Sequence, residues 1–206
     1  KNIRYLHPKA EAQDQTSLRA YASFGFNLVS VMLPVIYYTQ DKRPHLKQLG
    51  VVRPCQDKDL ATLRKIARNS MRFDHFHSDP HFSKETSDSV YEALIENCCK
   101  GKLADKVFVA ERKGNVVGYV ACQIRHDLNK ILPIRLGHIR HLAVAQPEGF
   151  ACGPGLQEVA LSWFQDKVDV VESATTIQNS AILKISLKSG MNIVAPFLRF
   201  AKWFEA

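Results

Sequence analysis

The 206-residue sequence contains five cysteines but no Cys-x-x-Cys pair. An odd number of cysteines argues against a disulfide framework, and the missing pairs argue against a structural zinc site. A reducing compartment follows, and we expect the protein to be cytoplasmic. His75, His77 and His81 lie close together in the sequence, but no other residues supply a matching ligand set, so we expect no metal.

The sequence also lacks an apolar run long enough to cross a membrane. The longest candidate, residues 26–38, is broken by Asn27, Ser30 and Pro34. The first residues are polar and unlike a signal peptide, so we expect no membrane partner. The chain begins at Lys1 instead of a methionine, and we expect a further segment upstream.

The residues that are present describe a basic globular protein with a real core. Hydrophobic residues make up 46% of the chain, and 28 Lys and Arg against 20 Asp and Glu give a net charge of +8. This excess suits an anionic partner, such as a phosphorylated cofactor, a nucleotide or a nucleic acid. The basic residues are scattered, however, and a solvated surface explains scattered charge equally well.

A charged stretch with Pro44 and Gly50 predicts a linker and a domain boundary near residue 46. We therefore expect a small N-terminal helix-strand unit over residues 1–46 and a main domain over 47–206. In the first unit, residues 1–15 resemble a loose lead-in, 17–24 a helix and 26–38 a strand. Residues 24–29 and 189–194 share a helix-Gly-strand pattern, which suggests that the first unit is the end of a related α/β unit.

The hydrophobic periodicity of the main domain predicts alternating strands and helices. Ser87 or Asp88 is expected to start the second helix, and Asn179 to cap the last one. The predicted fold class is α/β, with a mixed, mostly antiparallel central sheet and helices on both faces. The expected strands are 51–54, 106–112, 116–125, 138–144, 169–176 and 193–204, and the expected helices follow residue 59, residue 87, residue 155 and residue 179.

The stretch Leu142–Phe164 predicts a strand, a glycine loop and a helix. Such a junction leaves backbone N–H groups free at the positive end of a helix, where glycines allow a phosphate to approach. Many glycine loops serve only as turns, so the pattern alone leaves both interpretations open.

The order of elements and four local matches resemble the GNAT superfamily of N-acetyltransferases. The matches are strand 139–144, the loop 150–155, the segment 179–183 and Lys188-Ser189-Gly190. The chain is most similar to the bacterial members that acetylate a TDP-linked 4-amino-4,6-dideoxygalactose (TDP-fucosamine). The resemblance implies a GNAT-like fold and acetyl-coenzyme A as cosubstrate, with the pantetheine arm along the strand and the pyrophosphate on the loop.

By this resemblance, the expected cofactor-binding residues are Leu142, Val144, Phe150, Ala151, Cys152, Gly153, Gly155 and Asn179. Two residues depart from the family pattern, because Phe150 replaces an Arg or Gln and Pro154 has no amide to donate. Pro154 nevertheless suits the first turn of a helix. Ser186 stands where the family has the Tyr that protonates the leaving thiolate, and we consider it as a proton relay or as a packing residue.

His138 and His141 are candidate acceptors for the proton of the amine, because histidine titrates near neutral pH. Their spacing of three residues predicts opposite faces of the sheet, so only one should face the substrate, and we favour His138 slightly. By resemblance, the loop 72–82 borders the acceptor. Its candidate substrate-binding residues are Phe73, His75, Phe76, His77 and Phe82, although the aromatic members also suit the anchoring of a long loop.

The sequence thus favours an enzyme that transfers an acetyl group from acetyl-coenzyme A to a primary amine, with an amino-deoxysugar carried on a nucleotide as the expected acceptor. We expect no nucleic-acid partner, and a monomer or homodimer. Phe150, Pro154 and Ser186 leave a catalytically weakened coenzyme A-binding or regulatory protein as the first alternative. The charge of +8 leaves a nucleic-acid binder as the second.

Overall fold

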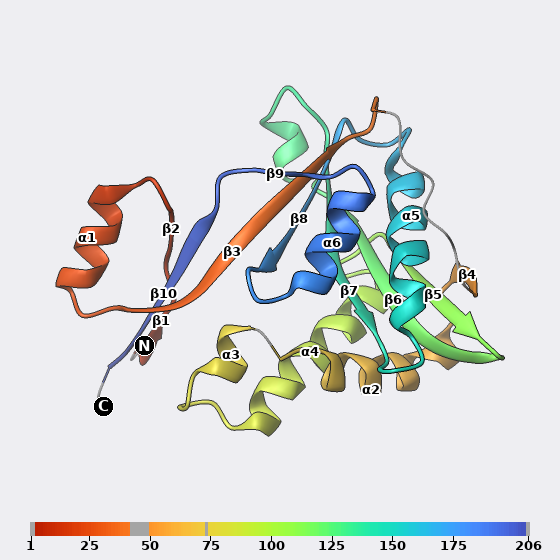
Figure 1. Ribbon diagram of the computed structural model, residues 1–206, viewed down its shortest axis with the longest axis horizontal. Coiled ribbons are helices and arrows are strands. Elements are labelled where there is room, and N and C mark those ends of the chain that lie inside the picture. Colours follow the sequence, from red (N-terminus) through yellow and green to blue (C-terminus); the bar gives the residue numbers. More distant parts are fainter. Residues whose placement is uncertain (1–2, 42–49, 73, 205–206) are drawn as a thin grey trace.

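The computed structural model describes residues 3–41, 50–72 and 74–204, and within these residues one mixed sheet of ten strands forms the centre of the molecule (Figure 1). The main strand order is β1-β10-β3-β8-β7-β6-β5-β4, with β2 paired to β10 and β9 paired to β3. All pairs are antiparallel except β7 with β8. The strands are β1 (Tyr5–Leu6), β2 (Lys9–Glu11), β3 (Asn27–Tyr38), β4 (Val51–Pro54), β5 (Lys106–Arg112), β6 (Asn115–Ile124), β7 (Leu136–Val144), β8 (Val170–Thr176), β9 (Asn192–Ile193) and β10 (Phe197–Trp203). The predicted fold class is confirmed.

Helices cover both faces of the sheet, and each face has its own hydrophobic core. On one face, α5 packs on β5, β6 and β7 through fully buried residues such as Leu156 and Phe164. On the other, α2 and α4 pack together and on β5, β6 and β7, with Leu63 and Ile95 at their centre. The helices are α1 (Gln15–Ser23), α2 (Leu60–Ser70), α3 (His75–Ser78), α4 (Lys84–Cys99), α5 (Gly153–Phe164) and α6 (Ser180–Lys188), with short 3-10 turns at Asp57–Asp59, Leu128–Lys130 and Phe150–Cys152.

Capping explains where two of the helices begin. The Asn179 side chain accepts a hydrogen bond from the Ile182 amide (3.3 Å) and starts α6 as predicted. Pro154 lies in the first turn of α5, also as predicted. In the part of the chain that the structure describes, no helix combines the length and the apolar character that a bilayer span needs.

Three local predictions were wrong. Helix α4 begins at Lys84, because the Ser83 hydroxyl caps it, so Ser87 and Asp88 lie inside the helix and are buried. Residues 1–15 contain β1 and β2, which gain backbone partners only by pairing with β10, far away in the sequence. The loop 72–82 contains the short helix α3, which the Asp74 side chain caps.

The N-terminal helix-strand pair adds its strand to the interior of the sheet. Strand β3 lies between β8 and β10, so it is flanked on both sides by strands from the C-terminal half (Figure 1). Gly25 and Gly190 both adopt positive φ (72° and 88°) at the joint between a helix and a strand, which agrees with the repeated sequence pattern. The boundary at residue 46 lies outside the described residues, and the division into two units stays a prediction.

Gly137 provides a test of how tightly α5 packs on the sheet. A Cβ atom at this position would lie 2.6 Å from the Phe164 ring and 3.1 Å from Val168. Both of these side chains are fully buried, so they have little room to move. We expect Gly137→Ala to lower the free energy of unfolding by about 1–3 kcal/mol, measured by urea denaturation. An unchanged urea midpoint would contradict this packing.

Candidate functional site

The sheet opens between β7 and β8. These parallel strands pair only from Leu136 with Val170 to His138 with Glu172, and then diverge toward their C-terminal ends (Figure 1). Ala145 donates its amide to Val117 of β6 (2.8 Å), so by alternation the backbone groups of Leu142 and Val144 point away from β6 and into the gap. No described strand pairs with them there, and an unpaired strand edge is a ready partner for amide groups of a ligand.

Two serine hydroxyls mark the ends of this open edge. Ser173 donates to the Ile139 carbonyl (3.3 Å), where the strands separate, and Ser70 donates to the Val144 carbonyl (3.1 Å), where β7 ends. The gap between these points leads into a cavity of about 260 Å³, which we call the strand-gap cavity. It is lined by Ser70, Met71, Leu142, Ala143, Val144, Gln146, Phe150, Gly153, Gln178, Asn179, Ser180, Ala181, Ile182 and Ile185.

Two helix N-termini meet at the strand-gap cavity. Gly153 starts α5 and Ser180 starts α6, and both residues line it. The positive ends of the two helix dipoles therefore favour an anionic ligand there. Gly149 permits the tight turn before α5, since a Cβ atom at this position would lie 2.3 Å from the Val117 carbonyl oxygen.

The structure brings some of the predicted cofactor-binding residues to the strand-gap cavity and not others. Leu142, Val144, Phe150, Gly153 and Asn179 line it, whereas Ala151, Cys152 and Gly155 do not. The Cys152 amide donates to the Gly149 carbonyl (2.9 Å), so this amide already has a partner. The Cys152 side chain is fully buried, and burial raises the pKa of its thiol, which fits a packing residue.

A second cavity of about 200 Å³ adjoins the first, and we call it the arginine cavity because three arginines line it. Ser70, Met71 and Asn179 line both cavities, so the two meet at these residues. The arginine cavity is lined by Ser30, Met32, Ser70, Met71, Arg72, Asp74, His75, Tyr91, Leu94, Arg140, His141, Ala174, Thr175, Thr176, Asn179 and Arg199. A ligand in one cavity can thus reach a ligand in the other.

His141 is the histidine of β7 that lines the arginine cavity. Its Nδ1 lies 2.7 Å from the Tyr119 hydroxyl, and its ring stacks on Tyr91 at a centroid distance of 5.7 Å. Its Nε2 is buried and has no partner among the described residues. Burial lowers the pKa of His141 to about 4, so the imidazole is neutral at pH 7.

His138 lines neither of these two cavities, and the prediction that His138 and His141 lie on opposite faces of the sheet was wrong. Ala121 pairs with His141 and Cys122 with Ile139, so Arg140 forms a bulge in β7. Gly137 and Ile139 face α5, because a Cβ at Gly137 would meet Phe164 and Ile139 packs in the α5 core. His138, between them, therefore lies on the opposite face, which is also the face of His141. The bulge thus removes the expected alternation. His138 Nδ1 lies 3.2 Å from Glu172, at the closed end of the strand gap.

Ser186 also lies away from both cavities. The residue is 2% exposed and is buried within α6. Its carbonyl accepts hydrogen bonds from the Ser189 hydroxyl (2.7 Å) and the Met191 amide (3.0 Å), which close the C-terminal end of the helix. This position fits the packing interpretation of Ser186.

The structure describes four of the substrate-binding residues predicted in the loop 72–82. Of these four, only His75 lines the arginine cavity. Phe76 and Phe82 pack edge to face, with centroids 5.3 Å apart, and anchor the loop. His77 is held between two carboxylates, with Nδ1 2.6 Å from Asp74 and Nε2 3.0 Å from Asp88. Phe73 lies outside the described residues.

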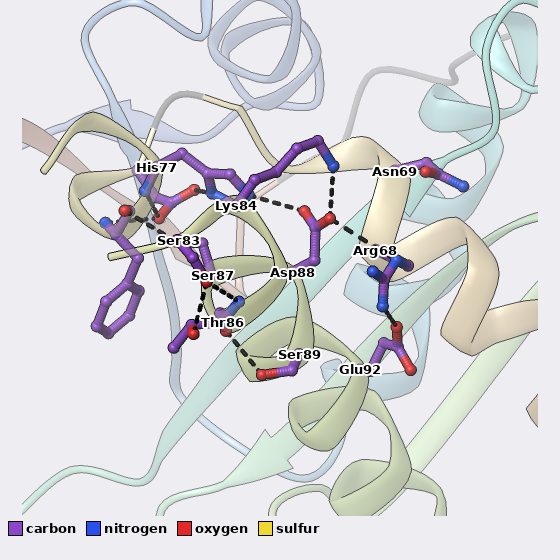
Figure 2. A network of polar contacts seen from close by, with 12 residues as sticks. Arg68, Asn69, His77, Ser83, Lys84, Thr86, Ser87, Asp88, Ser89 and Glu92 are labelled. Carbon is purple, nitrogen blue, oxygen red and sulfur yellow. Dashed lines mark hydrogen bonds and ion pairs between the residues drawn. The ribbon is translucent and has the colours of Figure 1, made fainter. Parts of the chain in front are cut away.

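Asp88 of α4 connects the loop 72–82 to α2, through contacts with His77 and Arg68 (Figure 2). Its side chain, 2% exposed, contacts His77, Lys84 and the Arg68 guanidinium (3.7 Å). Figure 2 shows these contacts converging on one carboxylate between α2 and α4. A buried carboxylate with three cationic or hydrogen-bonding partners fixes the loop at the mouth of the arginine cavity.

The Asp88 contacts predict a loss of stability when this charge is removed. Asp88→Asn removes the carboxylate that pairs with the exposed Lys84 and with Arg68, which keeps Glu92 as a second partner (2.7 Å), so we expect the free energy of unfolding to fall by about 1–2 kcal/mol. Amide hydrogen exchange over residues 74–82 should accelerate as well. Glu85→Gln, an exposed change on the same helix, is the control. Equal effects of the two variants would contradict the role of Asp88.

The two neutral histidines of the arginine cavity predict a pH dependence of stability. Burial lowers the pKa of both His141 and His75 to about 4, below the value of about 6.5 in the unfolded chain. Between these values only the unfolded state binds the protons, so stability falls as the pH drops from about 6.5 to about 4. His141→Gln should flatten this part of the stability profile, measured by chemical denaturation, whereas the exposed His126→Gln should not. An unflattened profile for His141→Gln would contradict its burial as a neutral group.

The described geometry, a mostly antiparallel sheet that opens between two parallel strands beside two helix N-termini, is the fold of GCN5-related N-acetyltransferases. The structure of such an enzyme from Sphaerobacter thermophilus matches with a TM-score of 0.65 at 14% identity, over 97% of this chain and 59% of that chain. The ribosomal-protein-alanine N-acetyltransferase from Brucella melitensis matches with a TM-score of 0.51 at 17% identity, over 75% of this chain and 99% of that one.

One sequence relative is a polysaccharide biosynthesis protein. The spore coat polysaccharide biosynthesis protein SpsD from Bacillus subtilis (strain 168) is 28% identical over 104 residues, which make up 50% of this chain and 34% of SpsD. No protein-family model matches the chain. The GNAT-like fold is therefore established by structure, while the chain spans only about a third of this relative.

Proposed function

We propose that the protein is an N-acetyltransferase that moves an acetyl group from acetyl-coenzyme A to a primary amine. The observation that carries this proposal is the meeting of two cavities at Ser70, Met71 and Asn179, beside the open edge of β7. One cavity offers helix N-termini and backbone groups that have no strand partner among the described residues, which suit a cofactor with amides and a pyrophosphate. The other offers polar side chains for the amine.

Acetyl-coenzyme A would lie in the strand-gap cavity, and the residues present fit it. Leu142 and Val144 offer backbone groups to its amides, and the first turns of α5 and α6 face its phosphates. The cosubstrate supplies the activated acetyl group, which forms an amide bond to the amine as the C–S bond breaks. The leaving thiol has a pKa of about 8.5, so its thiolate needs little help to depart, and the absence of a Tyr at Ser186 is compatible with the reaction.

For the acceptor, we infer an amino sugar that is linked to a nucleotide. The similarity to SpsD supports this inference, because its name places it in polysaccharide biosynthesis. The arginine cavity also supports it, since three guanidinium groups suit the phosphates of such a molecule.

We assign the orienting role at the reacting centre to His141. The buried Tyr119 hydroxyl lies 2.7 Å from His141 Nδ1, its hydrogen-bonding partner within the part of the chain that the structure describes, so the hydroxyl is best satisfied by donating to this nitrogen. Nε2 then carries the proton and faces the cavity as a donor. With a pKa of about 4, His141 is a weak base, so it orients the reactants while the amine loses its proton to solvent.

The first test measures binding and turnover. We expect purified protein to bind acetyl-coenzyme A by calorimetry and to release free thiol when nucleotide-linked amino sugars are added. Binding without turnover on any amine would favour the coenzyme A-binding alternative. Absence of binding would refute the proposed function.

A second test addresses His141. We expect His141→Ala to lower kcat by about 10²-fold, because a preorganised donor is lost, and His141→Gln to retain more activity. Ser186 lines neither cavity, so Ser186→Ala should keep kcat close to that of the wild type. In the wild type, kcat/KM should rise with pH toward the pKa of the acceptor amine. A titration near pH 6.5 that disappears in His141→Gln would instead show that His141 is the base.

A further inference from the structure

The arginine cavity contains more positive charge than the protein itself neutralises. Arg72, Arg140 and Arg199 line it, and within the described residues none of the three forms an ion pair. Other arginines do form ion pairs with carboxylates, namely Arg53, Arg64, Arg68, Arg125 and Arg135. Asp74 is the single carboxylate that lines the cavity, and it already accepts from the Phe76 amide (2.9 Å) and contacts the His77 ring (2.6 Å).

Arg199 is the arginine on β10, and it is partly buried. Its guanidinium donates to His75 Nδ1 (3.3 Å) and lies 5.7 Å from the centroid of the Phe197 ring. His75 is neutral at pH 7, because its pKa is lowered to about 4, so it positions the guanidinium without neutralising it. A guanidinium withdrawn from water without a counter-ion is costly, and an anion bound beside it would offset that cost.

Two further polar atoms in the same cavity have no partner. His141 Nε2 and Thr176 Oγ1 are buried and unpaired among the described residues, and their side chains belong to residues that are only 9% and 8% exposed. Both residues line the arginine cavity. Buried polar groups are normally hydrogen-bonded, so these atoms indicate independently that a polar ligand completes the cavity.

The strand order sets the separation between the two ends of this ligand. His141 is on β7 and Arg199 on β10, and β8 and β3 lie between them. Three paired strand spacings would separate the two backbones by roughly 14 Å, and the divergence of β7 and β8 beyond His138 makes the separation larger; the two side chains partly bridge it. The amine must lie near the junction of the cavities, close to β7, so the anion lies at the far end, several bonds away.

We propose that Arg199 binds an anionic oxygen group of the acceptor, a phosphate or a carboxylate, at the end of the molecule opposite the reacting amine, with His75 as the residue that positions its guanidinium. This inference rests on the proposed function. The separation favours an acceptor whose amine and anionic group are on different carbons, such as an amino sugar phosphate. It disfavours an α-amino acid, in which the amine and the carboxylate share one carbon.

The direct test uses the Nε–H signal of Arg199 in a ¹⁵N NMR spectrum, assigned by its absence in Arg199→Met. We expect this signal to shift saturably when inorganic phosphate or acetate is added. The anion that binds more tightly in this titration shows whether Arg199 recognises a phosphate or a carboxylate. A signal that neither anion moves would overturn the proposal. This measurement does not require acetyl transfer, so it decides the question even if the proposed function fails.

Kinetics provide the second arm, with an amino sugar phosphate and the same sugar without phosphate as acceptors. Arg199→Met should lower kcat/KM for the phosphorylated sugar by about 10- to 100-fold, mainly through a higher KM. The kcat/KM for the sugar without phosphate and the KM for acetyl-coenzyme A should stay nearly unchanged. Arg199→Lys should lose less, because it keeps the charge but not the planar fork. Arg19→Met, an exposed change on α1, is the control.

An equal loss on both acceptors would show that Arg199 has only a structural role and would overturn the proposal. If Arg199→Met does not fold, Arg199→Lys and the wild-type NMR titration carry the test, with the Arg199 signal assigned from Arg199→Lys.

Discussion

The site depends on one constraint, the unpaired edge of β7 in the middle of the sheet. Strands β7 and β8 share only three residue pairs before they diverge, from Leu136–Val170 to His138–Glu172. Beyond that point the backbone groups of Leu142 and Val144 have no strand partner among the residues that the structure describes, which is costly inside a protein unless a ligand supplies one. The serine hydroxyls of Ser173 and Ser70 satisfy the carbonyls at the two ends of the edge and leave its centre open.

The rest of the fold surrounds this opening. Helices α5 and α6 place their N-termini beside it, and the network around Asp88 fixes the loop that closes the neighbouring cavity. Strand β3, from the N-terminal end of the chain, extends the sheet beyond β8 and brings β10 with it. Without β3, Arg199 would have no place in the arginine cavity, so residues from both ends of the chain build one site.

Much of the framework could be predicted from the sequence, because local signals determine it. Apolar periodicity and the cap at Asn179 predict α6, and Pro154 agrees with the first turn of α5. Residues such as Leu142 and Val144 could be related to the cavity through a family resemblance, because the pattern of strand, loop and helix is continuous in the sequence.

The remaining features depend on contacts that the sequence does not display. The bulge at Arg140 arises in the pairing of β6 with β7, so the spacing of His138 and His141 gave the wrong faces. Arg199 enters the site only through the position of β10, and Tyr119 only through its contact with His141. In the loop 72–82, packing against α4, β3 and β10 decides that His75 lines the cavity while Phe76 and Phe82 anchor the chain.

The most direct test of the central claim is a crystal structure of the protein with coenzyme A. The account predicts that the pantetheine arm lies along β7 in the gap, with its amides on the backbone of Leu142 and Val144 and its pyrophosphate at the start of α5. Coenzyme A bound elsewhere, or a gap that closes by pairing β7 with β8, would contradict it.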